Sequence, residues 1–146
     1  MSSSERLDAF TNAIRHLEGY SSKIAGELAA QYEALTLQDL TALTVLGLHG
    51  PSRMGALAEH LSIAQSTLTP IVDRLEDHGL ARRRRSKADR RVWLVELTDA
   101  GEEVVADMNA LYRQVAASML DPLSEEEQAT FVSLFIKVTD TLSETE

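Results

Sequence analysis

The most restrictive feature of this sequence is a short basic segment, residues 81–93, which reads ARRRRSKADRRVW. It holds seven of the fourteen Lys and Arg residues of the chain. Residues 80–85 and 92–97 have the pattern of two strands around the loop SKADR, with Trp93, Val95 and Leu97 alternating on one face. The pattern therefore predicts a β-hairpin that is loaded with arginine.

The rest of the chain has the opposite charge. The formal net charge is −9, yet residues 51–97 carry nine basic and six acidic residues, a net of +3. The remaining residues carry five basic and seventeen acidic ones, a net of −12. A polyanion is therefore repelled by most of the surface and attracted by one part of it. A solvated charged hairpin with no partner is the simpler alternative.

The flanking regions are predicted to be helical, which suits a composition with 44% hydrophobic but 5% aromatic residues. Over residues 5–33 apolar side chains recur in steps of three, four and seven, which predicts one long amphipathic helix. A stripe of this length favours packing against a second subunit. Residues that can cap further helices follow at Thr36 with Asp39, at Ser52, at Thr98, and at Ser124 with Glu127.

Residues 53–80 have the pattern of a helix-turn-helix, with Ala58 where the two short helices come closest. The second helix is expected from about Gln65 to His78, and Gly79 ends it at the C′ position. Two ordinary packed helices would give a similar pattern. The order of this helix, a glycine and an arginine-rich hairpin is nevertheless that of a winged helix, whose second helix exposes polar side chains that reach base edges or phosphates.

The hairpin would then be the wing. An arginine-rich wing tip can enter the minor groove of DNA, where the negative potential is strongest. Asp89 would repel DNA, so we expect it to pair with Arg91 or a neighbouring arginine and brace the loop. Trp93 is expected to be the apolar anchor of the wing rather than a platform for base stacking.

Residues 35–105 resemble the winged-helix core of MarR-type transcriptional regulators. The motifs that carry the resemblance are STLTPIVDRLEDHGL (residues 66–80), DRR (residues 89–91) and VELTDAGEE (residues 95–103). The resemblance implies a mainly α fold with a small β-hairpin wing. Residues 35–99 would form the winged helix-turn-helix, and residues 1–34 and 100–146 a helical dimerisation region. It further implies a homodimer on a pseudo-palindromic double-stranded DNA operator, with repression relieved by a small, often aromatic, ligand.

The residues expected to bind DNA lie on the second helix and the wing. They are Gln65, Ser66, Thr67, Thr69, Pro70, Arg74, Arg84, Arg85, Lys87, Arg90 and Arg91, with Asp89 as the brace. The resemblance gives Arg74 a phosphate-binding or bracing role and places Arg91 in the minor groove. A candidate effector pocket is expected between the first helix, the helix beginning near Gln38 and the helix beginning near Asp99. Its candidate residues are His16, Tyr20, Tyr32 and Tyr112.

Three positions depart from the family pattern. Ser62 stands where many such turns have glycine, and Ala64 replaces a polar N-cap at a cost of about 1 kcal/mol. Pro70 removes one backbone hydrogen bond within the second helix and risks a bend. TLTP (residues 67–70) resembles the branch that senses organic hydroperoxides through a reactive cysteine, but the chain has no cysteine, so thiol oxidation is excluded.

Other functions find little support in the sequence. The histidines, at positions 16, 49, 60 and 78, share no metal-ligand spacing, and no glycine-rich phosphate loop is present. We therefore expect neither an enzyme nor a metal or cofactor site apart from the effector. No apolar run is long enough for a membrane span, and the N-terminus lacks a secretory signal, so a cytoplasmic protein is expected. Two alternatives stay open: an interaction module whose basic hairpin binds an acidic protein, and a DNA binder without an effector.

Overall fold

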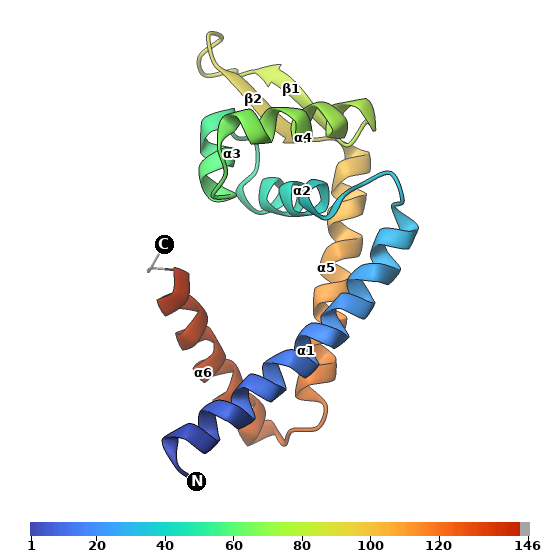
Figure 1. The fold of residues 1–146 in the computed structure, drawn as a ribbon. Coiled ribbons are helices and arrows are strands. Elements are labelled where there is room, and N and C mark those ends of the chain that lie inside the picture. Colours follow the sequence, from blue (N-terminus) through green and yellow to red (C-terminus); the bar gives the residue numbers. More distant parts are fainter. Residues whose placement is uncertain (144–146) are drawn as a thin grey trace. The chain divides into compact units, whose positions relative to one another are not determined.

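The computed structural model describes residues 1–143 and shows helices with one two-stranded antiparallel sheet (Figure 1). The elements are α1 (Ser3–Gln31), α2 (Leu37–His49), α3 (Met54–His60), α4 (Gln65–Asp77), β1 (Ala81–Arg85), β2 (Trp93–Leu97), α5 (Asp99–Leu120) and α6 (Glu125–Ser143). The predicted mainly α fold with a β-hairpin is confirmed. The chain forms two compact units, Met1–Asn109 and Ala110–Glu146, so α5 belongs to both. The functional division into residues 35–99 and two flanking helical parts stays a prediction.

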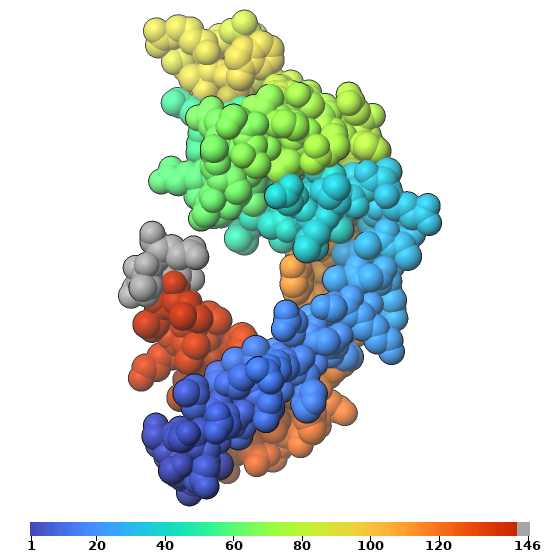
Figure 2. All heavy atoms as spheres, in the orientation of Figure 1, coloured from blue at the N-terminus to red at the C-terminus, as the bar shows by residue number. Residues whose placement is uncertain are grey.

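The core of the first unit lies between α2, α4 and the hairpin. Apart from Asp39, its large fully buried side chains are aliphatic, and burying them removes apolar surface from water: Leu43, Leu46, Leu57, Leu68, Val72, Leu75 and Val95. The hairpin pairs Ala81 with Leu97 at its base and Arg85 with Trp93 at its far end. This register directs Val95 into the core and leaves the far end of the hairpin beyond the helices, as Figures 1 and 2 show.

Predicted caps account for three of the helix starts. Thr36 and Asp39 form a capping box at α2. The Gly101 N–H donates to Thr98 Oγ1 (3.1 Å) at α5, and Ser124 and Glu127 cap each other's backbone at α6. The expectation that Ser52 caps α3 is wrong, because Arg53 is the N-cap and makes no capping hydrogen bond. The backbone of Ser52 instead pairs with Val95 through two hydrogen bonds, of 2.9 and 2.8 Å, and so adds one bridge to the free edge of β2.

The turn between α3 and α4 contains a residue in the left-handed region, Ser62, with φ of 54°. The N–H of Ile63 reaches back to the carbonyl of Ala58 (3.0 Å) and the N–H of Ser62 to that of Glu59 (3.0 Å). These two bonds form a Schellman ending, which normally has glycine at the C′ position. Serine therefore replaces the usual glycine at a position whose left-handed backbone conformation is unfavourable for a residue with a Cβ.

The end of α4 is joined to the start of α5 by an unusually close backbone contact. Gly79 has φ of 70° and ends α4 at the C′ position, as predicted. Thr98 Oγ1 donates to the Gly79 carbonyl (2.6 Å), and the Thr98 N–H donates to the Leu80 carbonyl (3.1 Å). A Cβ on Gly101 would lie 1.9 Å from that Leu80 oxygen, so only glycine fits there. The exit from the wing is thereby fixed against the end of α4.

Apolar side chains on α1 and α6 remain exposed. On α1 the relative exposures of Leu7, Phe10 and Ile14 are 66%, 63% and 49%, in the steps of three and four that define one helix face. On α6 the exposed large apolar residues are Val132, Leu134, Phe135, Ile136, Val138 and Leu142. Among the described residues no helix is both long and apolar enough to cross a membrane.

Candidate nucleic-acid interface

The N-terminal face of α4 is exposed and polar. Leu68, Ile71 and Val72 of this helix face the core. The residues predicted to face a major groove are exposed: Gln65, Ser66, Thr67, Thr69 and Pro70. Ala64 is the N-cap and supplies no side-chain hydrogen bond, so the positive end of the helix lacks a protein acceptor there. The helix continues through Pro70 as one element.

Arg74 ties α4 to the start of α2. Its guanidinium donates to both carboxylate oxygens of Asp39, with Nη2 2.8 Å from Oδ1 and Nε 3.3 Å from Oδ2. Burial opposes ionisation of Asp39, but hydrogen bonds from Arg74 and Thr36 outweigh it and hold the pKa of that carboxyl below its ordinary value. Of the two roles that the sequence left open for Arg74, this geometry favours the brace.

Three of the wing arginines are paired with carboxylates near the base of the hairpin. Arg82 Nε and Arg84 Nε donate to the two oxygens of Glu96, at 2.7 and 2.6 Å. On the other face Arg83 pairs with Asp73 (2.9 Å) and with Glu76. Arg84, a predicted DNA contact, therefore already has an ionic partner within the protein.

The wing tip, residues 85–91, carries the exposed charge. Asp89 accepts hydrogen bonds from the N–H, Nε and Nη2 of Arg91, at 3.1 Å or less. These bonds hold the pKa of Asp89 below its ordinary value. The Arg91 side chain remains 90% exposed, so the pair fixes the loop without hiding the guanidinium. Lys87 and Arg90 are also exposed and have no carboxylate partner within residues 1–143.

Trp93 differs from its predicted role as an apolar anchor. It is 51% exposed, and the guanidinium carbon of Arg85 lies 4.6 Å from the centre of its ring. Its pairing with Arg85 places Trp93 at the outer end of the ladder, farthest from the paired residues Ala81 and Leu97 at the base. Val95, two residues nearer the base, is 1% exposed and anchors the wing instead. Arg85 Nη1 also donates to the Arg90 carbonyl (2.6 Å), so the Arg85 side chain spans the tip.

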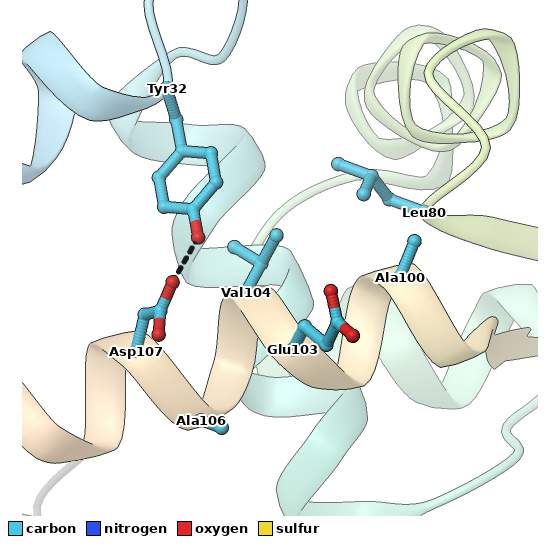
Figure 3. Close-up of a pocket in the computed structure, with 7 residues that line it drawn as sticks. All are labelled: Tyr32, Leu80, Ala100, Glu103, Val104, Ala106 and Asp107. Atoms are coloured by element: carbon cyan, nitrogen blue, oxygen red, sulfur yellow. Dashed lines mark hydrogen bonds between the residues drawn. The ribbon is translucent and has the colours of Figure 1, made fainter.

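A pocket of about 410 Å³ lies between the end of α1, Leu80 just before β1, and the first half of α5 (Figure 3). Its polar groups are Tyr32, Glu103 and Asp107, and its apolar lining consists of Leu80, Ala100, Val104 and Ala106. Tyr32 donates a hydrogen bond to Asp107, which raises the pKa of the phenol to about 12. Of the predicted pocket residues, Tyr32 alone lines this pocket.

The other three predicted pocket residues are elsewhere. His16 and Tyr20 are exposed on α1, and Tyr112 belongs to the second compact unit. His49 and His60 stack with ring centres 3.7 Å apart. Within residues 1–143 no group of three or more histidine or acidic side chains could hold a metal ion.

Sequence reasoning missed two important carboxylates, Glu96 and Asp39. Glu96 lies opposite Arg82 because seven residues, 86–92, separate the paired Arg85 and Trp93, whereas the loop SKADR by itself would place Leu94 there. The contact between Asp39 and Arg74 had no signal in the sequence, since it joins two helices whose crossing the sequence does not define.

Comparison with known proteins assigns the family. A sequence model of the MarR family matches residues 35–93. The chain is 31% identical over 104 residues to YpoP of Bacillus subtilis, an uncharacterised HTH-type transcriptional regulator, covering 71% of this chain and 74% of that protein. A MarR-family structure from Bacillus stearothermophilus aligns with a TM-score of 0.81 at 24% identity, over 98% and 99% of the two chains.

The fold also matches that of a protein crystallised with DNA. The FabT structure from Streptococcus pneumoniae, in complex with DNA, aligns with a TM-score of 0.76 at 19% identity, over 97% of this chain and 99% of that one. The match to YpoP, the family model and the winged-helix geometry agree. The chain therefore belongs to the MarR family of winged-helix transcriptional regulators.

Proposed function

We propose that this regulator is a homodimeric repressor that binds a pseudo-palindromic operator and is released by a small aromatic effector. MarR-family proteins are DNA-binding regulators, not enzymes, so an interaction module for an acidic protein is no longer a competing interpretation. The observation that carries the proposal is the combination of an exposed, uncapped α4 N-terminus with a wing tip of net positive charge. The similarity in fold to FabT, whose structure is a complex with DNA, supports the same use of the fold here.

The exposed apolar face of α1 supports the dimer. Burying a Phe, Leu or Ile side chain contributes about 1.5–3 kcal/mol each, so Leu7, Phe10 and Ile14 together offer a substantial driving force. A dimer would present two α4 helices to successive major grooves about 34 Å apart, which requires an operator with two related half-sites.

A charge on this face tests the dimer. Phe10→Glu places a carboxylate within the proposed interface and should shift the protein to monomers in sedimentation equilibrium. Asn12→Glu introduces the same charge on the opposite side of α1 and should leave the dimer intact. A native protein that sediments as a monomer at micromolar concentration would refute the proposal, as would a Phe10→Glu variant that stays fully dimeric.

Footprinting on the DNA upstream of the protein's own gene tests operator binding. We expect protection of two half-sites about one helical turn apart, and affinity that falls with salt by about 0.9 log units per tenfold change for each phosphate neutralised. Transcription from that promoter in vitro should decrease when the protein is added. An increase in transcription would replace repression by activation, and a single protected half-site would contradict the dimeric mode of binding.

The acidic lining of the pocket limits which charge an effector can carry. Glu103 and Asp107 disfavour an anion, and the Tyr32 phenol keeps its proton at neutral pH. The effector should therefore be aromatic and neutral or positively charged. Benzylamine and benzoate are a matched pair of probes, since they differ mainly in the sign of their charge.

Release of a fluorescent operator distinguishes the outcomes. Benzylamine at millimolar concentration should release the DNA, and Asp107→Asn should weaken this response. Release by benzoate alone would contradict the assignment of charge. If neither a panel of aromatic amines nor one of aromatic acids releases the operator, the protein is the DNA binder without an effector.

A further inference from the structure

We propose that Glu96 limits the non-specific DNA affinity of the wing. Its carboxylate binds Arg82 and Arg84 in the place that a DNA phosphate would otherwise take. The inference requires only that the protein binds DNA, and it is independent of repression, dimerisation and an effector. It assigns to Glu96 a part in sequence discrimination, because non-specific binding is mainly electrostatic and independent of sequence.

The hairpin geometry places one carboxylate between two guanidinium groups. Arg82 lies directly opposite Glu96 in the register, and Arg84 follows two residues later on the same face of β1. Each oxygen of Glu96 accepts one Nε–H, at 2.7 and 2.6 Å. The Glu96 side chain is only 12% exposed, whereas those of Arg82 and Arg84 are 64% and 32% exposed. The carboxylate therefore lies beneath both arginines, and both acceptor oxygens are in use.

The carboxyl group of Glu96 is ionised at the neutral pH at which the protein would bind DNA. Hydrogen bonds from Arg84 and Arg82 hold the pKa of its carboxyl below the ordinary value. It is therefore ionised at neutral pH, and it subtracts one unit of charge from this face of the hairpin.

The charges of the wing consequently divide into two parts. At the base, Arg82, Arg83 and Arg84 are balanced by Glu96, Asp73 and Glu76, so the sum is zero. At the tip, four cations (Arg85, Lys87, Arg90 and Arg91) face one carboxylate, Asp89, which leaves +3. The attraction for DNA is therefore concentrated at the tip, which would enter a groove, and is weak along the strands.

Removing the charge of Glu96 should strengthen binding to any DNA. In Glu96→Gln one more positive charge becomes available on each subunit, enough to neutralise about one more phosphate. For each subunit in contact with a random duplex, the salt slope should become steeper by about 0.9 and the affinity at 0.1 M salt should rise about tenfold. Affinity for the operator should rise less, because the register of α4 in its groove restricts where the arginines can reach. The ratio of specific to non-specific affinity should therefore fall.

Glu102→Gln is the matched control. Glu102 borders the same small pocket as Glu96 and is exposed on the first turn of α5, with no arginine partner within residues 1–143. The substitution Glu102→Gln removes one negative charge near Glu96, as Glu96→Gln does, but it frees no guanidinium. The affinity of Glu102→Gln for a random 20-base-pair duplex, measured by fluorescence anisotropy at several salt concentrations, should differ from that of the native protein by less than about twofold. An equal gain for Glu102→Gln would overturn the assignment in favour of a general field effect.

A double replacement on β1 provides an independent test. Arg82→Gln with Arg84→Gln removes the two guanidinium groups that Glu96→Gln would free for DNA. In the Glu96→Gln background the same double replacement should abolish the tenfold gain. The proposal is overturned if the gain persists when all three replacements are combined, since the freed arginines would then not be its source. It is also overturned if Glu96→Gln leaves the affinity and salt slope unchanged or lowers them.

Discussion

Replacing Gly101 by alanine should destabilise the first compact unit, because a side chain at this position has no room. The new Cβ would lie 1.9 Å from the carbonyl oxygen of Leu80, whereas ordinary contact begins at 3.4 Å. The start of α5 and the end of α4 would have to separate by about 1.5 Å, the difference between these distances. That movement would strain the hydrogen bonds of Thr98 to the Gly79 and Leu80 carbonyls.

The expected loss is about 3 kcal/mol. Overpacking of a rigid site costs about 1–3 kcal/mol, and a weakened backbone hydrogen bond adds about 1 kcal/mol. The better helix propensity of alanine offsets up to about 1 kcal/mol of this destabilisation. Because the clash is with a backbone oxygen, which cannot rotate away, we take the overpacking cost near the upper end of its range. For a chain of this size, about 3 kcal/mol corresponds to a decrease in Tm of about 6–12 °C.

Urea unfolding and thermal melting followed by circular dichroism would measure the effect of Gly101→Ala. Gly26→Ala is the control: it lies inside α1, a Cβ there would meet nothing within 4 Å, and it should stabilise by about 0.5–1 kcal/mol. The two identical substitutions should thus act in opposite directions. A Gly101→Ala variant at least as stable as the native protein would refute the steric argument.

Three further predictions concern the wing, the turn and the pocket. Arg91→Ala should weaken operator binding at least tenfold at fixed salt without dissociating the dimer. The control Arg6→Ala on α1 should have little effect on operator affinity. Equal losses of affinity for the two variants would contradict the role of the wing tip. Ser62→Gly should stabilise by about 1 kcal/mol in urea unfolding, whereas Ser62→Ala keeps the strained φ and should not. The Tyr32 pKa is raised to about 12 from 10.0, so the folded state retains a proton that the unfolded state loses. Stability should therefore fall between pH 10 and 12, and Tyr32→Phe should remove this part of the decrease.

The elements that local chemistry determines were predictable from the sequence. Capping boxes at Thr36 and Ser124, and the helix ending at Gly79, depend on residues within a few positions of one another. The hairpin follows from alternation around a short loop, but its register, with Arg85 opposite Trp93, was not predicted. The tertiary context escaped prediction, since alternation gives the face of Trp93 but not how far the helices beneath that face extend. Ser52 could cap a helix in isolation, but it is committed to β2.

The candidate site was predictable as a set of residues but not as a distribution of charge. The exposed face of α4 and the basic tip follow from sequence spacing. Whether an arginine is free or paired depends on contacts such as that between Arg74 and Asp39, which are 35 residues apart. For this reason Arg84 looked equivalent to Arg85 in the sequence, although the two side chains lie on opposite faces of β1.

The exposed indole at the end of the hairpin gives the protein an internal optical probe. Trp93 is the single tryptophan of the chain, so light absorbed at 295 nm excites this one ring selectively. Its emission therefore arises directly beside the tip that would meet the duplex, from a half-exposed ring on which the Arg85 guanidinium lies. Docking of that tip can be followed in real time from the intrinsic fluorescence, with neither a dye on the protein nor a label on the DNA.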